Sequence, residues 1–111
     1  MAANYGLEIE AGATFSLEFE YRNDDGTLFD FTGWTSKAQI RQTPSSSTAL
    51  EITTAINAST SVITISLTAN QTATLTFPNY VWAMELTQTA TSKVVRLVEG
   101  GVVVSPEIVR A

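Results

Sequence analysis

"FDFTGWTSKAQIR", residues 29–41, places three aromatic side chains and a glycine directly before a strict alternation of two kinds of residue. From Trp34 to Ile40 every second residue is apolar or small, and polar residues lie between them. A period of two is that of a β-strand, whose successive side chains point to opposite faces. Because Gly33 permits a sharp corner, we expect Phe31 and Trp34 on either side of it to turn inward and cover one end of a core.

The composition points to an all-β protein. The chain of 111 residues is 44% hydrophobic and 15% charged, and its polar residues are dominated by seventeen threonines and ten serines. Threonine is favoured in strands because its branched β-carbon suits a pleated surface, whereas helical proteins are richer in Lys, Glu and Gln. A chain of this length is expected to form one domain, over residues 1–111.

Alternating or apolar patterns predict strands along most of the chain. The segments expected to be extended are 14–21, 28–31, 34–41, 49–57, 63–67, 80–86 and 93–110, the last interrupted by Pro106. Turn signals separate them every eight to twelve residues. Seven to nine short strands at this spacing are typical of a two-sheet β-sandwich.

One helix and a set of structural residues complete this prediction. Thr68 and Gln71 form a capping box, which predicts a short helix near residues 69–75. A buried Trp34 would need a partner for its indole N–H, and we expect a backbone carbonyl. The residues expected to form the core, the corner and the end of the last strand are Phe15, Phe19, Phe31, Gly33, Trp34, Ile40, Tyr80, Trp82 and Pro106.

The last segment allows two structures. Gly100 and Gly101 either close a two-residue hairpin or form a bulge in one long strand that bends between sheets. We favour the bulge. Pro106 cannot donate a hydrogen bond to a neighbouring strand, so strand pairing is expected to end there.

Enzymatic chemistry is not expected. The chain has no cysteine and no histidine, which removes thiolate nucleophiles, disulfides and the commonest general base. No nucleophile-elbow or phosphate-binding glycine motif occurs. We therefore predict no catalytic residue, no cofactor and no metal ligand. No signal peptide and no apolar run long enough to span a membrane are visible in the sequence.

The acidic residues at positions 24, 25 and 30 are the nearest approach to a catalytic or calcium-binding cluster. Their spacing does not match an EF-hand loop, and Asp-Asp-Gly is common in hairpin turns. Calcium binding at this turn is left open, and an ordinary turn is the simpler interpretation.

Charge is unevenly distributed. The net charge is −5, and residues 1–30 contain seven acidic residues and one basic residue. An acidic region repels phosphate backbones, so nucleic acid is not an expected partner. The acids form either a solvated face or a docking surface for a basic partner. The candidates for that surface are Glu8, Glu10, Glu18, Glu20, Asp24 and Asp25.

Five blocks occur along the chain in a fixed order: "GATF" (12–15), "DFTGWTSKAQIR" (30–41), "LTANQTATL" (67–75), "YVWAMEL" (80–86) and "RLVEGGVVVSPE" (96–107). Together they resemble a family of small phage and prophage proteins related to the immunoglobulin-like N-terminal domain of baseplate upper proteins. Phe31 stands where that family usually has leucine. The resemblance covers nearly the whole chain, and its residues belong to the core, corners and turns.

The resemblance implies an immunoglobulin-like antiparallel β-sandwich with a single continuous last strand and no catalytic motif. It also implies a structural protein of the virion, made in the host cytoplasm before assembly. The expected location is the tail, the baseplate or the attachment of a tail fibre. The partners would be other virion proteins of the tail, baseplate or fibre or, for a decoration protein, the major capsid protein, bound by multiple copies that follow the symmetry of the particle.

Two alternative functions remain open. The first is a capsid decoration protein, since small β-sandwiches serve in both places. The second is a carbohydrate-binding module in which Tyr80, Trp82 or Trp34 would stack against a sugar ring.

Overall fold

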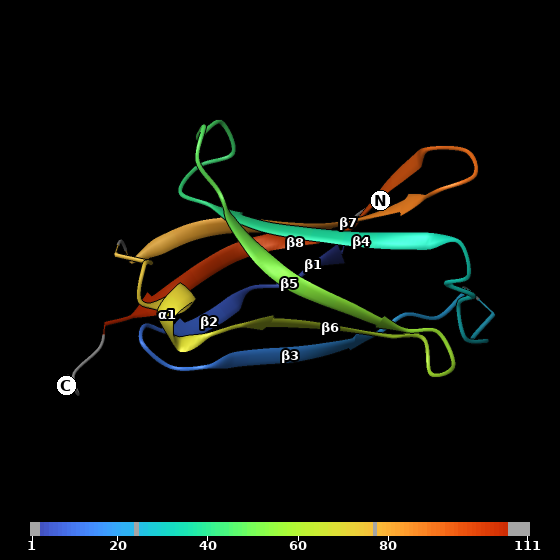
Figure 1. Cartoon of the computed structure of the whole chain (residues 1–111), viewed down its shortest axis with the longest axis horizontal. Coiled ribbons are helices and arrows are strands. Elements are labelled where there is room, and N and C mark those ends of the chain that lie inside the picture. Colours follow the sequence, from blue (N-terminus) through green and yellow to red (C-terminus); the bar gives the residue numbers. More distant parts are fainter. Residues whose placement is uncertain (1–2, 24, 77, 107–111) are drawn as a thin grey trace.

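The computed structural model describes residues 3–23, 25–76 and 78–106. These residues contain eight strands and one short helix, joined by turns and loops (Figure 1). They are β1 (Ala3–Asn4), β2 (Leu7–Glu10), β3 (Phe15–Glu20), β4 (Trp34–Arg41), β5 (Leu50–Asn57), β6 (Val62–Leu67), α1 (Ala69–Thr72), β7 (Asn79–Gln88) and β8 (Lys93–Ser105). The predicted all-β class with one short helix is confirmed. The capping box at Thr68 and Gln71 is present, and the helix is shorter than predicted because Ala73 already caps it.

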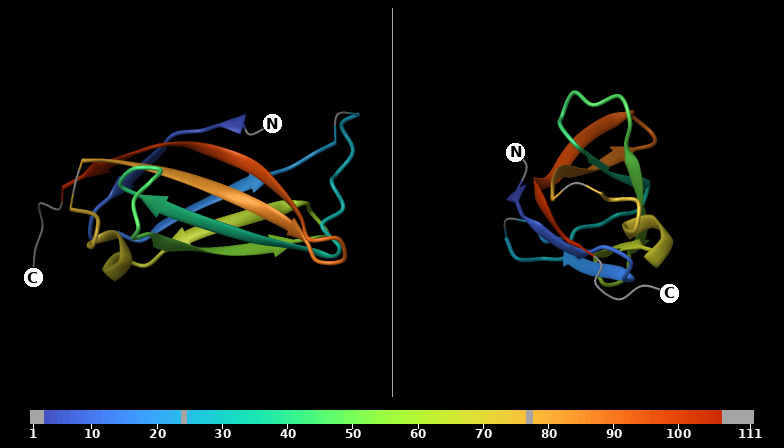
Figure 2. Two further views of the ribbon diagram at one scale, coloured as in Figure 1. Left: turned by 90° about the horizontal axis from the view of Figure 1, so that it is seen from above. Right: turned by 90° about the vertical axis from the view of Figure 1, so that its left-hand side faces the viewer.

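The strands form one folded-over sheet in the order β1-β8-β7-β4-β5-β6-β3, with β2 also beside β8. The fold occurs in β5, whose residues 50–52 pair with β4 and whose residues 53–57 pair with β6. One layer therefore contains β8, β7 and β4, and the other contains β6 and β3. The end view in Figure 2 shows the strands arranged around a common interior, so this sandwich is nearly closed into a barrel.

The two layers and the crossing of β5 between them agree with the all-β sandwich that was expected. The prediction of a wholly antiparallel sheet is wrong, because the sheet is mixed. Both β1 and β2 run parallel to β8. Side chains alternate between faces in parallel and antiparallel strands alike, so the sequence pattern carries no information about strand direction. β1 and β2 were also not among the segments expected to be extended, and of the expected strand at 28–31 only Leu28 forms a bridge, with Arg22.

β8 is one continuous strand, so the hairpin alternative at Gly100 and Gly101 is excluded. The bulge is present but lies elsewhere. Met84 pairs with Val98 and Glu85 pairs with Arg96, which leaves Leu97 as the extra residue. The predicted bulge at the glycines is therefore wrong in position. Strand pairing ends at Ser105, directly before Pro106, as expected.

Gly100 has a different role, which is to let the N-terminal chain pass close by. A β-carbon at this position would lie 2.2 Å from the carbonyl oxygen of Tyr5. That carbonyl accepts a hydrogen bond of 2.8 Å from the indole Nε1 of Trp82, and the Tyr5 amide donates to the Glu99 carbonyl at 2.9 Å. Only glycine permits this approach, which provides the buried indole with its acceptor.

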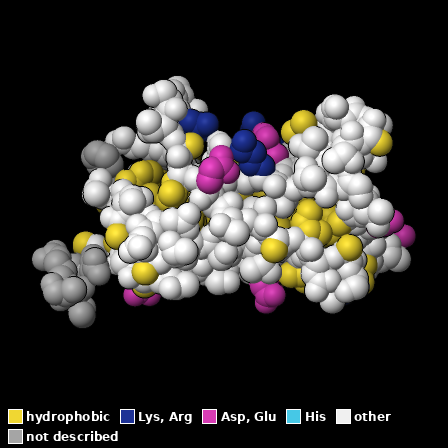
Figure 3. All heavy atoms as spheres, viewed as in Figure 1, with side chains coloured by type: hydrophobic (Ala, Val, Ile, Leu, Met, Phe, Trp, Pro, Cys, Tyr) yellow, Lys and Arg dark blue, Asp and Glu magenta, His cyan; other side chains and the backbone are white. Residues whose placement is uncertain are grey.

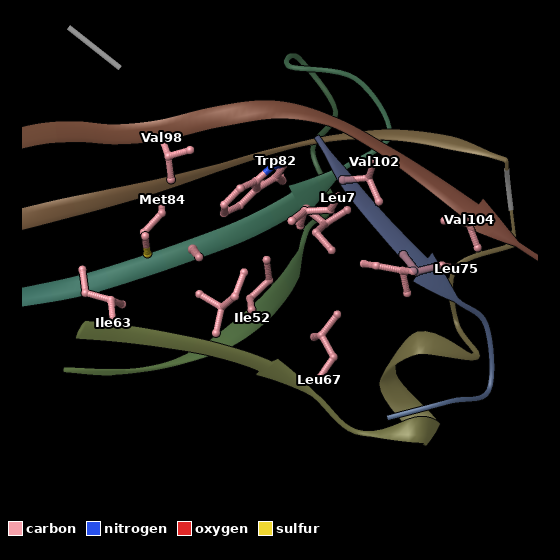
Figure 4. Close-up of a cluster of buried hydrophobic side chains, with 14 of the residues drawn as sticks. Leu7, Ile52, Ile63, Leu67, Leu75, Trp82, Met84, Val98, Val102 and Val104 are labelled. Atoms are coloured by element: carbon pink, nitrogen blue, oxygen red, sulfur yellow. The ribbon is translucent and has the colours of Figure 1, made fainter. Parts of the chain in front are cut away.

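The core lies between the two layers, and Figure 4 shows Trp82, Leu7 and Leu67 in it. Trp82 is 3% exposed, and its ring stacks on Phe19 with centroids 5.9 Å apart. Of the other expected structural residues, Phe31 and Ile40 are buried. Those that are half-buried are Phe15, Phe19, Trp34 and Tyr80, whereas Gly33 and Pro106 are exposed.

The corner around Gly33 closes one end of the core with aromatic rings. Gly33 adopts a φ of 81°, and Phe31 is 2% exposed. Ring centroids of Phe29 and Phe31 lie 4.9 Å apart, and those of Phe29 and Trp34 lie 5.7 Å apart. Trp34 is only half-buried and forms no side-chain hydrogen bond with a described residue, so the expected indole–carbonyl bond belongs to Trp82 instead.

Gly100→Ala is expected to destabilise the protein by about 2–3 kcal/mol, because the added methyl group collides with the Tyr5 carbonyl and the Trp82 hydrogen bond is lost. Urea unfolding followed by tryptophan emission measures this loss. Gly101→Ala is the matched control, since a β-carbon there meets nothing within 4 Å. The control should change stability by about 0.5 kcal/mol or less. Equal effects of the two substitutions would contradict the role assigned to Gly100.

Candidate interaction surfaces

A groove of about 800 Å³ crosses the outer face of β4, β7 and β8. Its lining includes the small residues Val81, Ala83 and Gly101. The longer side chains around them are Lys37, Gln39, Arg41, Glu85, Arg96 and Glu99. Figure 3 shows this hollow at the top of the molecule, with charged side chains between two raised parts of the surface. The hollow arises because the strand register places long side chains around Val81, Ala83 and Gly101, whose side chains are short or absent.

Oppositely charged residues stand side by side across the groove. In the strand register Lys37 is opposite Glu85, and Glu85 is opposite Arg96. The two bases make their ion pairs elsewhere, Lys37 with Glu51 at 3.8 Å and Arg96 with Glu99 at 3.0 Å. Glu85 forms no ion pair with a described residue. Exposed pairs of this kind each contribute about 0–1 kcal/mol, so a partner can replace them at little cost.

Arg41 is committed to the loop that borders the groove. Its Nη1 donates to the Ser46 carbonyl at 2.6 Å and to the Thr48 carbonyl at 3.4 Å, and its Nη2 donates to Gln39 Oε1 at 3.0 Å. These bonds hold the segment between β4 and β5 against the end of β4. The bases that remain available to a partner in the groove are therefore Lys37 and Arg96.

Four of the predicted partner-binding acids lie on two strands at the opposite side of the molecule. Glu8 and Glu10 are on β2, Glu18 and Glu20 are on β3, and all four are exposed. These strands border the opening where the barrel does not close, and they diverge from the turn that joins them (Figure 2). Only Glu20 forms an ion pair with a described residue, with Arg22 Nε at 2.8 Å. The acids thus share one surface, which is separate from the groove.

The remaining predicted acids belong to the turn after β3. Asp24 lies outside the described residues. Asp25 accepts hydrogen bonds from the Thr27 hydroxyl at 2.6 Å and the Thr27 amide at 3.0 Å, and Asp30 accepts one from the Thr32 amide at 2.9 Å. These bonds close local turns. Within the described ranges no three acidic side chains gather closely enough to hold a metal ion.

The aromatic residues considered for sugar stacking do not form a common platform. Trp82 faces the core and is covered by Phe19, so its ring is unavailable to a ligand. Trp34 packs on Phe29 at the closed end, and Tyr80 is half-buried at the start of β7. The groove is lined mainly by charged, polar and small residues, and Trp82, which also belongs to its lining, is only 3% exposed.

Sequence reasoning did not identify the groove. The polar face of residues 35–41 was visible in the alternation, but its neighbours on β7 and β8 depend on the strand register.

A scan against protein-family models finds no match, and no curated protein matches the sequence. No helix among the described residues is long and apolar enough to cross a membrane.

Thr27→Val is expected to raise the pKa of Asp25, because the Thr27 hydroxyl is the main cause that holds this pKa below its ordinary value. A lowered pKa in the folded state means that the stabilisation is present at neutral pH and is lost as the pH falls through that pKa. Carboxyl chemical shifts measured by NMR during an acid titration report the change. Asp30 is the internal control, since its lowered pKa depends on Thr32. An unchanged Asp25 midpoint would exclude the Thr27 contribution.

Proposed function

We propose that this protein is a structural component of a phage particle that binds other virion proteins in the tail or baseplate. Two lines support the proposal. The five sequence blocks resemble small phage proteins along nearly the whole chain, and the fold is of the class that this resemblance implies. The observation that carries the binding role is the charged groove on the outer face of β4, β7 and β8.

The groove suits a protein partner. Its charged side chains stand on three paired strands, so their spacing is set by the sheet rather than by a loop. Both charge signs are present, and complementary charges across an interface give specificity and a defined orientation more than raw affinity. A partner that offers a carboxylate to Lys37 or Arg96 and a base to Glu85 would match the pattern.

The number of copies in each particle distinguishes a location in the tail or baseplate from one on the capsid. A tail or baseplate component follows the low cyclic symmetry of that structure, whereas a decoration protein follows the copy number of the major capsid protein. Quantitative mass spectrometry of purified particles distinguishes the two. We expect the protein to be present and to be much less abundant than the capsid protein. Its absence from particles would exclude a virion role, and a stoichiometry close to that of the capsid protein would favour decoration.

Arg96→Glu is expected to lower incorporation into particles by about tenfold or more, because it places a like charge beside Glu85 and Glu99. Lys93→Glu is the matched control, since it makes the same charge change on the same strand outside the groove lining. Particles assembled with each variant are compared by mass spectrometry, and circular dichroism checks that both variants fold. Similar incorporation of the two variants would exclude the groove as the docking site.

A further inference from the structure

The alternation of inward and outward residues does not stop at the turn between β2 and β3. Odd-numbered residues from position 7 to position 21 are all apolar: Leu7, Ile9, Ala11, Ala13, Phe15, Leu17, Phe19 and Tyr21. The even-numbered residues between them are polar, charged or glycine. The turn at residues 11–14 therefore keeps the two strands in phase, so β2 and β3 also match the pattern of one continuous strand.

The turn between β5 and β6 does not keep its two strands in phase. Between β5 and β6 the apolar positions change from even-numbered Ile52 and Ile56 to odd-numbered Ile63 and Ile65. Straightening that turn would move one strand's apolar side chains into solvent. The turn at 11–14 has no such restriction, and it contains no proline.

Few contacts hold the turn at residues 11–14 closed. Gly12 has a φ of 83°, and the Ala13 amide donates to the Glu10 carbonyl at 3.1 Å. The buried Thr72 hydroxyl accepts from the Gly12 amide at 3.0 Å and donates to the Ala13 carbonyl at 2.8 Å. The Ala11 amide donates to the Ser105 carbonyl at 2.9 Å, a bond that continues the arm's pairing with β8. Extended backbone is also open to glycine and alanine. Opening the turn breaks the two bonds to Thr72, whose hydroxyl keeps the Ala69 carbonyl as an acceptor at 3.1 Å, and it leaves the strands on either side intact.

The segment before the turn, which we call the N-terminal arm (residues 3–10), occupies a slot on the edge of β8. It contributes two strand pairings to β8, the buried side chains of Leu7 and Ile9, and the Tyr5 carbonyl that accepts from Trp82. Gly100 leaves room for the arm's backbone rather than for a side chain. The slot thus recognises an extended chain with a carbonyl at one position, and every copy of the protein offers the same slot.

We propose that the N-terminal arm exchanges between two copies of this protein, through opening of the turn at 11–14 into a continuous strand from Leu7 to Glu20. Each copy then fills the β8 slot of the other, and the Trp82 indole receives the Tyr5 carbonyl of the second copy. The arm of a second copy makes the same contacts in the β8 slot as the copy's own arm. The equilibrium between monomer and exchanged dimer therefore depends on the conformation of the turn and on protein concentration. This interaction does not rest on the proposed virion function, so either can fail alone.

The test uses two single-cysteine variants, Glu8→Cys and Val103→Cys, in a chain that has no native cysteine. Glu8 and Val103 are partners in the β2–β8 register, and both are exposed. Adjacent strands lie about 4.8 Å apart, which is within the reach of a disulfide. The variants are mixed, unfolded, refolded together at high concentration and oxidised. The double variant in one chain is the positive control for this geometry.

Exchange predicts a disulfide-linked pair of different chains, at a yield about tenfold above that of Glu18→Cys mixed with Val103→Cys. Glu18 is equally exposed but lies on β3, which does not enter the β8 slot. A yield no higher than this control would overturn the proposal.

A second variant makes the test independent of refolding. Deleting Gly12 and Ala13 removes the turn but keeps the alternation in phase, because two residues are lost. We expect a stable dimer by light scattering, with the blue-shifted Trp82 emission of the native core. Inserting Gly-Ser after Gly12 keeps the phase and lengthens the turn, and it should leave a monomer. A deletion variant that is a folded monomer, or one that loses the native emission without forming dimers, contradicts exchange.

Discussion

The structure depends on one close approach between backbones, that of Tyr5 over Gly100. At this point the N-terminal chain passes from β1 to β2 along the edge of β8, and its carbonyl satisfies the indole N–H of Trp82. An unpaired N–H in this position would cost about 1–3 kcal/mol. Because the Trp82 ring also stacks on Phe19 of the other layer, this contact links the edge strand, the central strand β7 and the opposite layer.

A second constraint separates the layers. β5 leaves β4 after three residue pairs and joins β6, and the Ser36 and Thr54 hydroxyls hydrogen-bond at 2.7 Å where the strands diverge. The crossing gives β4 and β7 an outer face that no other layer covers. The groove lies on that face, so the path of β5 indirectly creates the surface that we propose binds a partner.

The acids of β2 and β3 and the bases that line the groove lie on different surfaces of the protein. Edge strands are sites where unrelated chains can pair, and charged side chains reduce this risk. Glu18 and Glu20 lie on the edge strand β3, and Glu8 and Glu10 lie on the neighbouring edge. Among the described residues, the bases Lys37, Arg41 and Arg96 line the groove, and Arg22 and Lys93 lie outside it. In the two proposals above, a virion partner would bind a face of the sheet, whereas exchange of the N-terminal arm would add a strand only where the matching slot exists.

The sequence by itself determined the class of the fold, the approximate bounds of its main strands, the short helix and its capping box. These features depend on local periodicity and local hydrogen bonds, which a single segment expresses without its neighbours. It also predicted acids on an exposed surface, and four of them do lie on β2 and β3. Only the tertiary structure decided the direction of β1 and β2, the bulge at Leu97, the role of Gly100 and the groove beside Arg96. Each of these depends on which residue stands opposite which, and the register between strands far apart in the chain is set by packing rather than by any one segment's pattern.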